Sequence, residues 1–240
     1  DYSRIVSNSY TILQEPFELE GVLRDVLHIV SGNAQRKNIS LDYENTADLH
    51  KQWLVGDSFR LKQILLNLFS NAIRFTPESG RVSLHVRIKG QDQEGRLLVK
   101  FEVKDTGIGM STEELQRIFN EFEQANQDTI NTYGGTGLGL SIVKELVTLQ
   151  EGYITVDSTP NAGSIFAFVL PYTTTVMAED NTELALTKEK VSESLTGSFQ
   201  GLVWVIDDDR FIRDWCSLVL KKLGIRHQVF ESGVAAVNHP

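Results

Sequence analysis

Apolar residues recur every three or four positions in several stretches of the chain, which is the spacing of one helix face. The clearest stretches are residues 17–36, 58–75 and 141–150. Asp57 precedes the second stretch and is a good N-cap for it. A further helix is predicted over 111–122, because its first residues, Ser-Thr-Glu-Glu, have the spacing of a capping box.

Other stretches alternate apolar and polar residues, as a strand with one buried face does. Residues 82–88 and 99–103 alternate in this way, and the polar turn around 90–95 between them predicts a hairpin. Shorter strands are predicted at 39–43, 53–56 and 154–156, and a nearly continuous apolar strand at 164–170. Pro171 is expected to close this domain.

The last part of the chain has a different character. Residues 173–198 are rich in Thr, Glu, Ser and Lys and are interpreted as a linker, partly helical around 184–191. A buried-type strand at 202–206, a helix ended by Gly224 and a second strand at 228–230 follow. This β-α-β order predicts a parallel sheet whose functional groups lie at the carboxyl ends of its strands.

Three carboxylates, Asp207, Asp208 and Asp209, stand at such a strand end. They repel one another unless a cation binds, so a Mg²⁺ site is favoured over simple solvated acids.

The cysteine content limits the chemistry that is possible elsewhere in the chain. The single cysteine, Cys216, excludes a disulfide framework and a cysteine-ligated metal site.

Length and charge set further limits. The 240 residues suffice for one substantial domain and part of another. A net charge of -9 and a pI near 5.1 argue against a general nucleic-acid binder, because there is no basic excess to neutralise phosphates. No apolar run has the length of a membrane span, and the first residues do not have the form of a signal peptide.

The richest glycine pattern is YGGTGLGL, residues 133–140, which runs directly into the predicted helix at 141–150. A glycine-rich turn that leads into a helix N-terminus offers unpaired N–H groups and a positive dipole end to a phosphate. The order matches neither the P-loop nor the GxGxxG form, and a flexible loop is the structural alternative. The polar stretch 124–133 before it is typical of a lid.

Asn67, Asn71 and Arg74 share one side of the predicted helix 58–75, at i, i+4 and i+7. Asparagine is a weak helix former, so two of them beside a core face need a reason. Amide oxygens can ligate Mg²⁺ and a cation can hold phosphate, so the stripe suits a metal-nucleotide complex. Hydrogen bonding between this helix and a loop is an equal alternative.

Asp105 stands at the end of the strand 99–103 and is followed by Gly107 and Gly109. The carboxylate is an acceptor that can read an exocyclic amine, and the glycines leave room for a flat ring against the backbone. A tight turn with an Asx hydrogen bond is the structural alternative.

With these residues assembled, the chain resembles a hybrid sensor histidine kinase of the two-component type. NLFSNAIRFT (67–76) resembles the N box of that family, DTGIGM (105–110) its first glycine box, IFNEFEQ (118–124) its F box and YGGTGLGLSIV (133–143) its second glycine box. All four follow in the family's order and spacing. WVIDDD (204–209) resembles the opening of a response-regulator receiver domain.

The resemblance implies an α/β fold in two parts. The first is a two-layer α/β sandwich of the GHKL (Bergerat) ATPase type, in which helices cover one face of a mixed sheet. The second is part of a doubly wound parallel receiver domain. The implied domains are the end of a dimerisation and phosphoacceptor hairpin (1–15), the ATP-binding catalytic domain (16–172), a linker (173–198) and the start of the receiver (199–240).

The resemblance also implies an activity. The kinase would transfer the γ-phosphate of ATP to a histidine upstream of residue 1, for relay to receiver aspartates in a phosphorelay. Asn71 would ligate Mg²⁺, Asn67 would help to hold the phosphates and the metal, and Arg74, where lysine is usual, would contact phosphate. Asp105 would accept a hydrogen bond from the adenine amine.

Further nucleotide contacts are implied at Phe75, Gly107, Gly109, Gly135, Thr136, Gly137, Leu138 and Gly139. Asp207 and Asp208 would bind the Mg²⁺ of the receiver. The implied partners are ATP, the chain's own upstream helices, and a receiver domain or response regulator, in a full-length homodimer without nucleic acid. The implied location is the cytoplasmic portion of a bacterial sensor anchored in the inner membrane.

The sequence departs from the family pattern in two respects. No segment carries the family's phosphoacceptor motif, because all the histidines stand in other contexts: His28, His50, His85, His227 and His239. Asn131 stands where many relatives have a lid arginine, which would weaken contact with the γ-phosphate.

Two alternatives stay open. One is another ATPase of the gyrase and chaperone superfamily, although those enzymes place a catalytic glutamate where this chain has Asn67 and lack a receiver. The other is a degenerate nucleotide-binding scaffold without kinase turnover.

Overall fold

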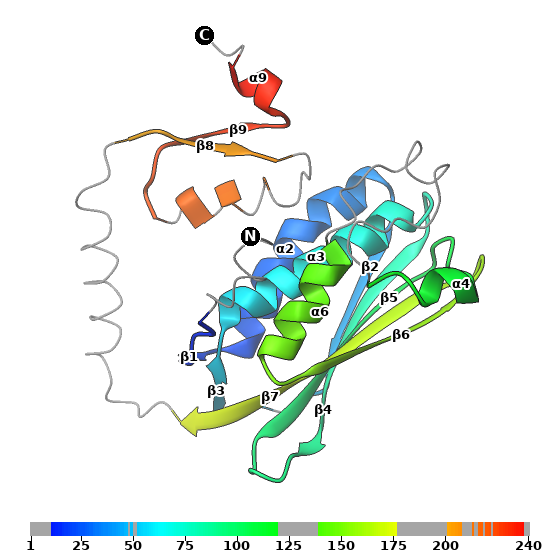
Figure 1. The fold of residues 1–240 in the computed structure, drawn as a ribbon, viewed down its shortest axis with the longest axis vertical. Helices are drawn as coiled ribbons and strands as arrows, with labels where there is room; N and C mark the ends of the chain where they lie inside the picture. Colours follow the sequence, from blue (N-terminus) through cyan, green and yellow to red (C-terminus); the bar gives the residue numbers. More distant parts are fainter. Residues whose placement is uncertain are drawn as a thin grey trace. The chain divides into compact units, whose positions relative to one another are not determined.

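The computed structural model describes residues 11–47, 49, 52–119, 139–176, 201–207, 213, 216–217, 219–221 and 223–237. The chain divides into two compact units, Asp1–Val176 and Met177–Pro240. Unit 1 holds the predicted sandwich, and unit 2 holds the predicted β-α-β segment (Figure 1).

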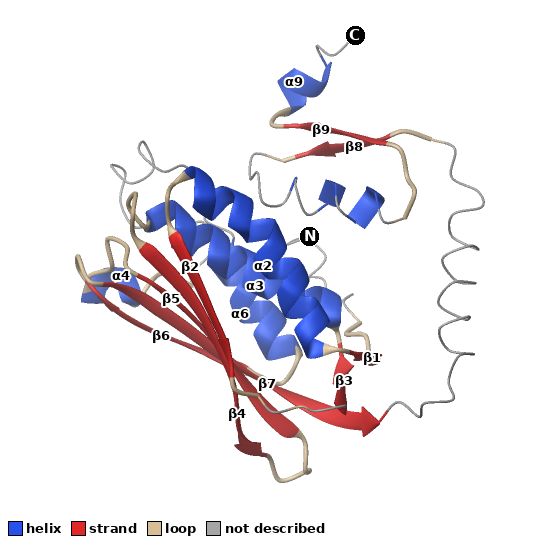
Figure 2. Cartoon of the chain, turned by 180° about the vertical axis from the view of Figure 1, so that it is seen from behind, coloured by secondary structure: helices blue, strands red, loops and turns tan. Residues whose placement is uncertain are grey.

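Unit 1 is built on one mixed sheet (Figure 2). Its strands are β1 (Glu15–Phe17), β2 (Ser40–Asn45), β3 (Gln52–Gly56), β4 (Arg81–Gln91), β5 (Leu97–Asp105), β6 (Tyr153–Thr159) and β7 (Gly163–Val176). The order is β1-β3-β7-β5-β4-β2, and β6 also pairs with β7. Among the described strand pairs of this sheet, only β2–β4 is parallel, which makes the sheet mixed as expected.

The long strand β7 corrects one sequence prediction. Pro171 does not close the domain: β7 continues to Val176, and Thr173–Val176, assigned to the linker from composition, pair with β3. On the same edge, Gly163–Val169 pair with β6. Residues 170–172 lie between these two partners and pair with β5 on the other edge, so a proline without an N–H is tolerated there.

Three helices cover one face of the sheet (Figures 1 and 2): α2 (Leu19–Arg36), α3 (Ser58–Phe75) and α6 (Gly139–Leu149). α3 contacts both of the others. It begins where predicted, because the Asp57 side chain accepts a hydrogen bond from Arg60 N at 2.9 Å. α2 begins two residues later than predicted, since Phe17 belongs to β1, and α6 begins two residues earlier.

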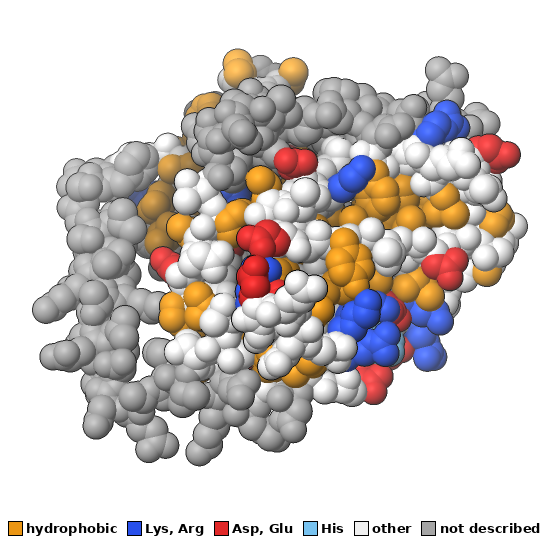
Figure 3. Space-filling model, turned by 60° about the horizontal axis from the view of Figure 1, so that its bottom comes forward, with side chains coloured by type: hydrophobic (Ala, Val, Ile, Leu, Met, Phe, Trp, Pro, Cys, Tyr) orange, Lys and Arg blue, Asp and Glu red, His pale blue; other side chains and the backbone are white. Residues whose placement is uncertain are grey.

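The core lies between the helices and the sheet. Its largest fully buried side chains include Phe69 of α3, Phe101 of β5 and Phe168 of β7. The rings of Phe101 and Phe168 stack with centroids 4.8 Å apart and face each other across paired strands. On the surface shown in Figure 3, basic, acidic and apolar side chains are interspersed.

The helix predicted at 111–122 is shorter in the described part of the chain. α4 spans Thr112–Leu115, and residues 116–119 form turns, while the rest lies outside the described residues. The predicted capping box is confirmed: Ser111 N donates to Glu114 Oε2 at 2.8 Å, and Glu114 N donates to Ser111 Oγ at 3.3 Å.

Unit 2 contains a parallel pair, β8 (Val203–Ile206) and β9 (His227–Phe230), followed by α9 (Gly233–Val237). The described residues between the strands include helical ones, such as Cys216 and Ser217. The predicted parallel pairing of the two strands is therefore confirmed, and the predicted helix between them is described only in part. The helix predicted around 184–191 lies outside the described residues. In the described part of the chain, no helix has the length and apolar character of a membrane span.

Candidate functional site

The predicted polar stripe of α3 lies along the border of its buried face. Asn67, Asn71 and Arg74 are half-buried, whereas most of their neighbours in the helix are buried. The stripe therefore borders the core without belonging to it. Its side chains are placed to meet a ligand or a neighbouring loop.

The loop after β5 packs on the last residue of this helix. Ile108 N donates a hydrogen bond to Phe75 O at 3.3 Å. A Cβ on Gly107 would lie 2.7 Å from the same carbonyl oxygen, so only glycine fits between the helix end and the loop. Two sequence motifs that are about 30 residues apart, the stripe of α3 and the first glycine pair, thus meet at one place.

Asp105, the last residue of β5, is the buried acid at this place, and only 5% of its surface is exposed. Its Oδ1 accepts hydrogen bonds from Gly107 N at 2.7 Å and from Ser164 N at 3.3 Å. Oδ2 accepts none from the described part of the chain. The Asx bond named as the structural alternative is present, but it occupies one oxygen and leaves the other for a donor.

The charge of Asp105 is disfavoured by its surroundings. Burial raises the pKa of this carboxyl above its ordinary value, and the two backbone N–H groups oppose that shift. An external donor that pairs with Oδ2 would offset part of the cost of burying the charge. This combination of burial and an unused acceptor is typical of a binding site.

Gly109 packs against the end of β6, and Gly163, the first residue of β7, packs against the end of β5. Gly109 has a φ of +65°, and a Cβ there would lie 1.9 Å from Thr159 O. A Cβ on Gly163 would lie 2.0 Å from Asp105 O. These glycines are required for packing between backbones, and whether Gly107 and Gly109 also make room for a ring stays a prediction.

Two residues of the site around Asp105 were not predicted from the sequence. Ser164 was assigned only to an apolar strand, yet its N–H reaches Asp105; the turn Asn-Ala-Gly before it was the available signal. Lys37, at the end of α2, donates from Nζ to Ile73 O at 2.9 Å and to Arg74 O at 2.8 Å. A basic residue at a helix end normally signals its own helix, not the neighbouring one.

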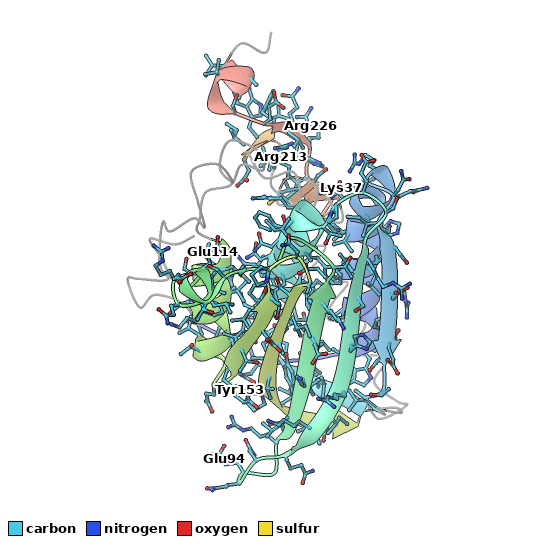
Figure 4. The ribbon with its side chains drawn as sticks, turned by 90° about the vertical axis from the view of Figure 1, so that its right-hand side faces the viewer. Lys37, Glu94, Glu114, Tyr153, Arg213 and Arg226 are labelled. Carbon is cyan, nitrogen blue, oxygen red and sulfur yellow. The ribbon has the colours of Figure 1, made fainter. Side chains whose placement is uncertain are left out.

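The site lies toward one end of the sheet. In Figure 4, Lys37 and Glu114 lie toward this end, and Glu94, in the β4–β5 turn, lies at the other. Burial lowers the pKa of Lys37, and the negative charge of Glu78 opposes that shift.

Several predicted residues lie outside the described residues: Gly135, Thr136, Gly137, Leu138, Asn131 and Asp208. Gly139 is the first residue of α6, so it stands at a helix N-terminus as predicted. Asp207 follows β8; its N–H donates to Phe230 O at 3.2 Å, and its carbonyl oxygen accepts from Arg213 Nη1 at 2.6 Å. Among the described residues, no group of three His, Cys, Asp or Glu could hold a metal ion.

Comparison with known proteins identifies the sandwich. Residues 56–174 match the model of the family described as histidine kinase-, DNA gyrase B-, and HSP90-like ATPase. The chain is 34% identical over 242 residues to hybrid signal transduction histidine kinase K of Dictyostelium discoideum, covering 97% of this chain and 19% of that protein. Residues 56–174 belong to a histidine kinase catalytic domain.

Other comparisons agree with this family. The histidine kinase domain is 40% identical over 169 residues to the sensor histidine kinase GacS of Pseudomonas protegens, covering 69% of this chain and 18% of that protein. The chain therefore spans about a fifth of the length of these two relatives. Relatives of this kind favour a histidine kinase over the gyrase and chaperone alternative.

Two solved structures resemble this chain. Full-length ShkA in complex with AMPPNP matches with a TM-score of 0.61 and 26% identity, over 99% of this chain and 45% of that chain. The catalytic domain of histidine kinase ThkA matches with a TM-score of 0.55 and 28% identity, over 66% of this chain and 95% of that chain. The sandwich is therefore that of an ATP-binding histidine kinase catalytic domain in two-component signalling.

Proposed function

We propose that this chain uses ATP and Mg²⁺ to phosphorylate a histidine on helices upstream of it, for relay to receiver aspartates. The observation that carries the proposal is that the two carboxylate oxygens of Asp105 differ in their hydrogen bonding. One carboxylate oxygen is fixed by two backbone N–H groups, and the other is left without a partner from the described residues. Such a carboxylate is suited to accept a hydrogen bond from the exocyclic amine of adenine.

The surroundings of Asp105 fit a nucleotide. The loop around Gly107 approaches α3 so closely that a Cβ would collide with Phe75 O, and this keeps the base-reading acid beside the polar stripe. Asn71 would ligate Mg²⁺, Asn67 would help to hold it and the phosphates, and Arg74 would contact phosphate. Phe75 and Gly109 would line the same site.

The metal would supply neutralisation of the charge on the phosphates. Phosphoryl transfer depends chiefly on positioning and charge neutralisation, so a stripe of neutral oxygen ligands and one cation is chemically suitable. The segment from Gly135 through Thr136, Gly137 and Leu138 to Gly139 would cradle the phosphates at the N-terminus of α6.

Unit 2 would be the start of a receiver domain, in which Asp207 and Asp208 bind Mg²⁺. The parallel β8–β9 pair and the position of Asp207 directly after β8 support this assignment. The receiver limits 199–240 are proposed with it, and the catalytic domain is proposed to run from Glu15, the start of β1, to Val176, the end of β7. The full-length protein would be a membrane-anchored homodimer with its cytoplasmic kinase acting on its own upstream helices and on a receiver or response regulator.

The test is isothermal titration of AMPPNP into the chain with and without Mg²⁺. Three proteins are compared: the unsubstituted chain, Asn71→Ala, and Asn45→Ala as a matched control on the edge strand β2. Binding should strengthen with Mg²⁺ in the unsubstituted chain and in Asn45→Ala, and should gain nothing from Mg²⁺ in Asn71→Ala. An equal gain in all three proteins would remove Asn71 from the metal site.

Turnover is tested in the full-length protein, where the upstream helices are present. Transfer of the labelled γ-phosphate to an acid-labile phosphohistidine is expected, and it should disappear in Asn71→Ala. If the full-length protein binds AMPPNP but transfers no phosphate, the degenerate nucleotide-binding scaffold replaces the kinase.

A further inference from the structure

Lys37 connects the end of one helix to the end of another. It follows α2 as its C-cap residue, and its Nζ donates to Ile73 O and Arg74 O, two of the last carbonyls of α3, at 2.9 and 2.8 Å. The C-terminus of a helix carries partial negative charge, so an ammonium group there is favoured. Figure 4 labels Lys37 toward the end of unit 1 that is opposite Glu94.

The carbonyls at the end of α3 can be accounted for in full. The last four carbonyls of an α-helix have no partner within the helix. In α3, Ala72 O accepts from Thr76 N at 3.0 Å and from Thr76 Oγ1 at 2.6 Å, and Phe75 O accepts from Ile108 N at 3.3 Å. The remaining two carbonyls have the ammonium of Lys37 as a shared donor.

The turn held in this way carries the proposed phosphate and metal contacts. Arg74 lies in it and Asn71 directly precedes it, and Arg74 O is itself an acceptor of Lys37. The next carbonyl, that of Phe75, holds the loop that leads from Asp105. Without Lys37, two carbonyls would lose a charged donor, and the last turn of α3 would be free to fray.

We propose that Lys37 is a positioning residue of the nucleotide site, which fixes the last turn of α3 and thereby sets Arg74 relative to the Asp105 loop. This inference rests on the proposed function, because the site it serves is the proposed ATP site. Lys37 would not touch the nucleotide. It would act through the backbone of the residues that do.

The chain offers a matched control in Lys62. Its Nζ pairs with Asp25 Oδ2 at 2.5 Å and so also ties α3 to α2, but near the start of α3. Lys62→Met removes a tie between the same two helices without touching the last turn. Comparison with Lys37→Met therefore separates loss of helix packing from loss of site geometry.

The experiment measures AMPPNP affinity and amide hydrogen exchange in the unsubstituted chain, Lys37→Met, Lys37→Arg and Lys62→Met. Lys37→Met should weaken AMPPNP binding about tenfold or more, because the frayed turn of α3 must be ordered again before it can hold the nucleotide. It should also speed exchange of the Ile108 amide. Lys37→Arg, which keeps the cation, and Lys62→Met should stay within about threefold of the unsubstituted chain in affinity.

Equal affinity and equal Ile108 exchange in Lys37→Met and Lys62→Met would overturn the inference. If no protein binds nucleotide, the proposed function fails, and exchange at Ile108 still decides whether Lys37 holds the turn. Should Lys37→Met not fold, Lys37→Gln, which keeps a donor without the charge, supports the same comparison.

Discussion

Asp105→Asn gives a sharp test of the proposed base-reading site. Asparagine keeps an oxygen that can accept from Gly107 N and Ser164 N, the two bonds that fix Oδ1. Its amide nitrogen takes the place of Oδ2 and is a donor. Toward the exocyclic amine of adenine, the substitution therefore exchanges an acceptor for a donor while the loop keeps its internal hydrogen bonds.

The size of the effect follows from the bond that is lost. A hydrogen bond to a charged group contributes about 1.5–3 kcal/mol, so AMPPNP should bind roughly 10- to 150-fold more weakly to Asp105→Asn. ITP carries a carbonyl where ATP carries the amine, and the new donor can pair with it. The preference for adenine over hypoxanthine should therefore disappear or reverse, which titration with both nucleotides measures.

Although Asp105→Asn should weaken nucleotide binding, it should not lower the stability of the folded protein at neutral pH. Burial raises the pKa of Asp105 above its ordinary value of 3.8, so the folded protein binds this proton more tightly than the unfolded chain does. The protonated Asp105 contributes fully to the stability of the folded state at pH values below its pKa in the unfolded chain. This contribution is lost as the pH rises through its pKa in the folded protein. At neutral pH, Asp105→Asn should therefore unfold at equal or higher urea concentration than the unsubstituted chain.

Two results would refute this reasoning. The first is an Asp105→Asn protein that keeps its AMPPNP affinity within about threefold and still prefers adenine, because the base would then be read elsewhere. The second is a marked loss of stability at neutral pH, which would mean that the buried charge is stabilised by more than its two backbone donors.

Two further substitutions test the packing that supports the site. Gly109→Ala would place a Cβ 1.9 Å from Thr159 O, whereas Gly95→Ala, at a similar φ of +79°, would meet nothing within 4 Å. Gly95→Ala should lower the free energy of unfolding by only about 1 kcal/mol, from backbone strain, and Gly109→Ala should lower it by more. Of the two variants, only Gly109→Ala should lose AMPPNP binding. Equal urea midpoints for the two variants would contradict this. Phe168→Ala empties a stacked position of the core and should cost about 3–5 kcal/mol in urea unfolding, and a loss below about 1.5 kcal/mol would contradict the packing described.

Local signals in the sequence predicted most of the elements. The periodic stretches of α2, α3 and α6 became helices, and the Asp57 cap and the Ser111 capping box are both present. These signals succeed because a cap is made within four residues and a helix face is repeated within each turn. The spacing of Asn67, Asn71 and Arg74 on one side follows from the same regularity.

The limits of local signals appear at Pro171 and Lys37. Composition and a proline predicted that the domain ends at residue 171, but β3 offers Thr173–Val176 a partner that lies about 120 residues earlier. Lys37 belongs to α2 in the sequence, and its two acceptors belong to α3. Neither the pairing of β7 with β3 nor the acceptors of Lys37 can be predicted from the sequence. A hydrogen-bonding group that is far from its partner along the chain has no local pattern that indicates the partner.

The sequence by itself determined which residues face inward and which motifs are candidates for the chemistry, since side-chain period and glycine content are properties of short segments. Only the tertiary structure decided what these motifs meet. Asp105 is a half-occupied acceptor because Ser164, 59 residues away, donates to the same oxygen as Gly107. That arrangement depends on the antiparallel register of β5 and β7, which long-range packing of the core sets.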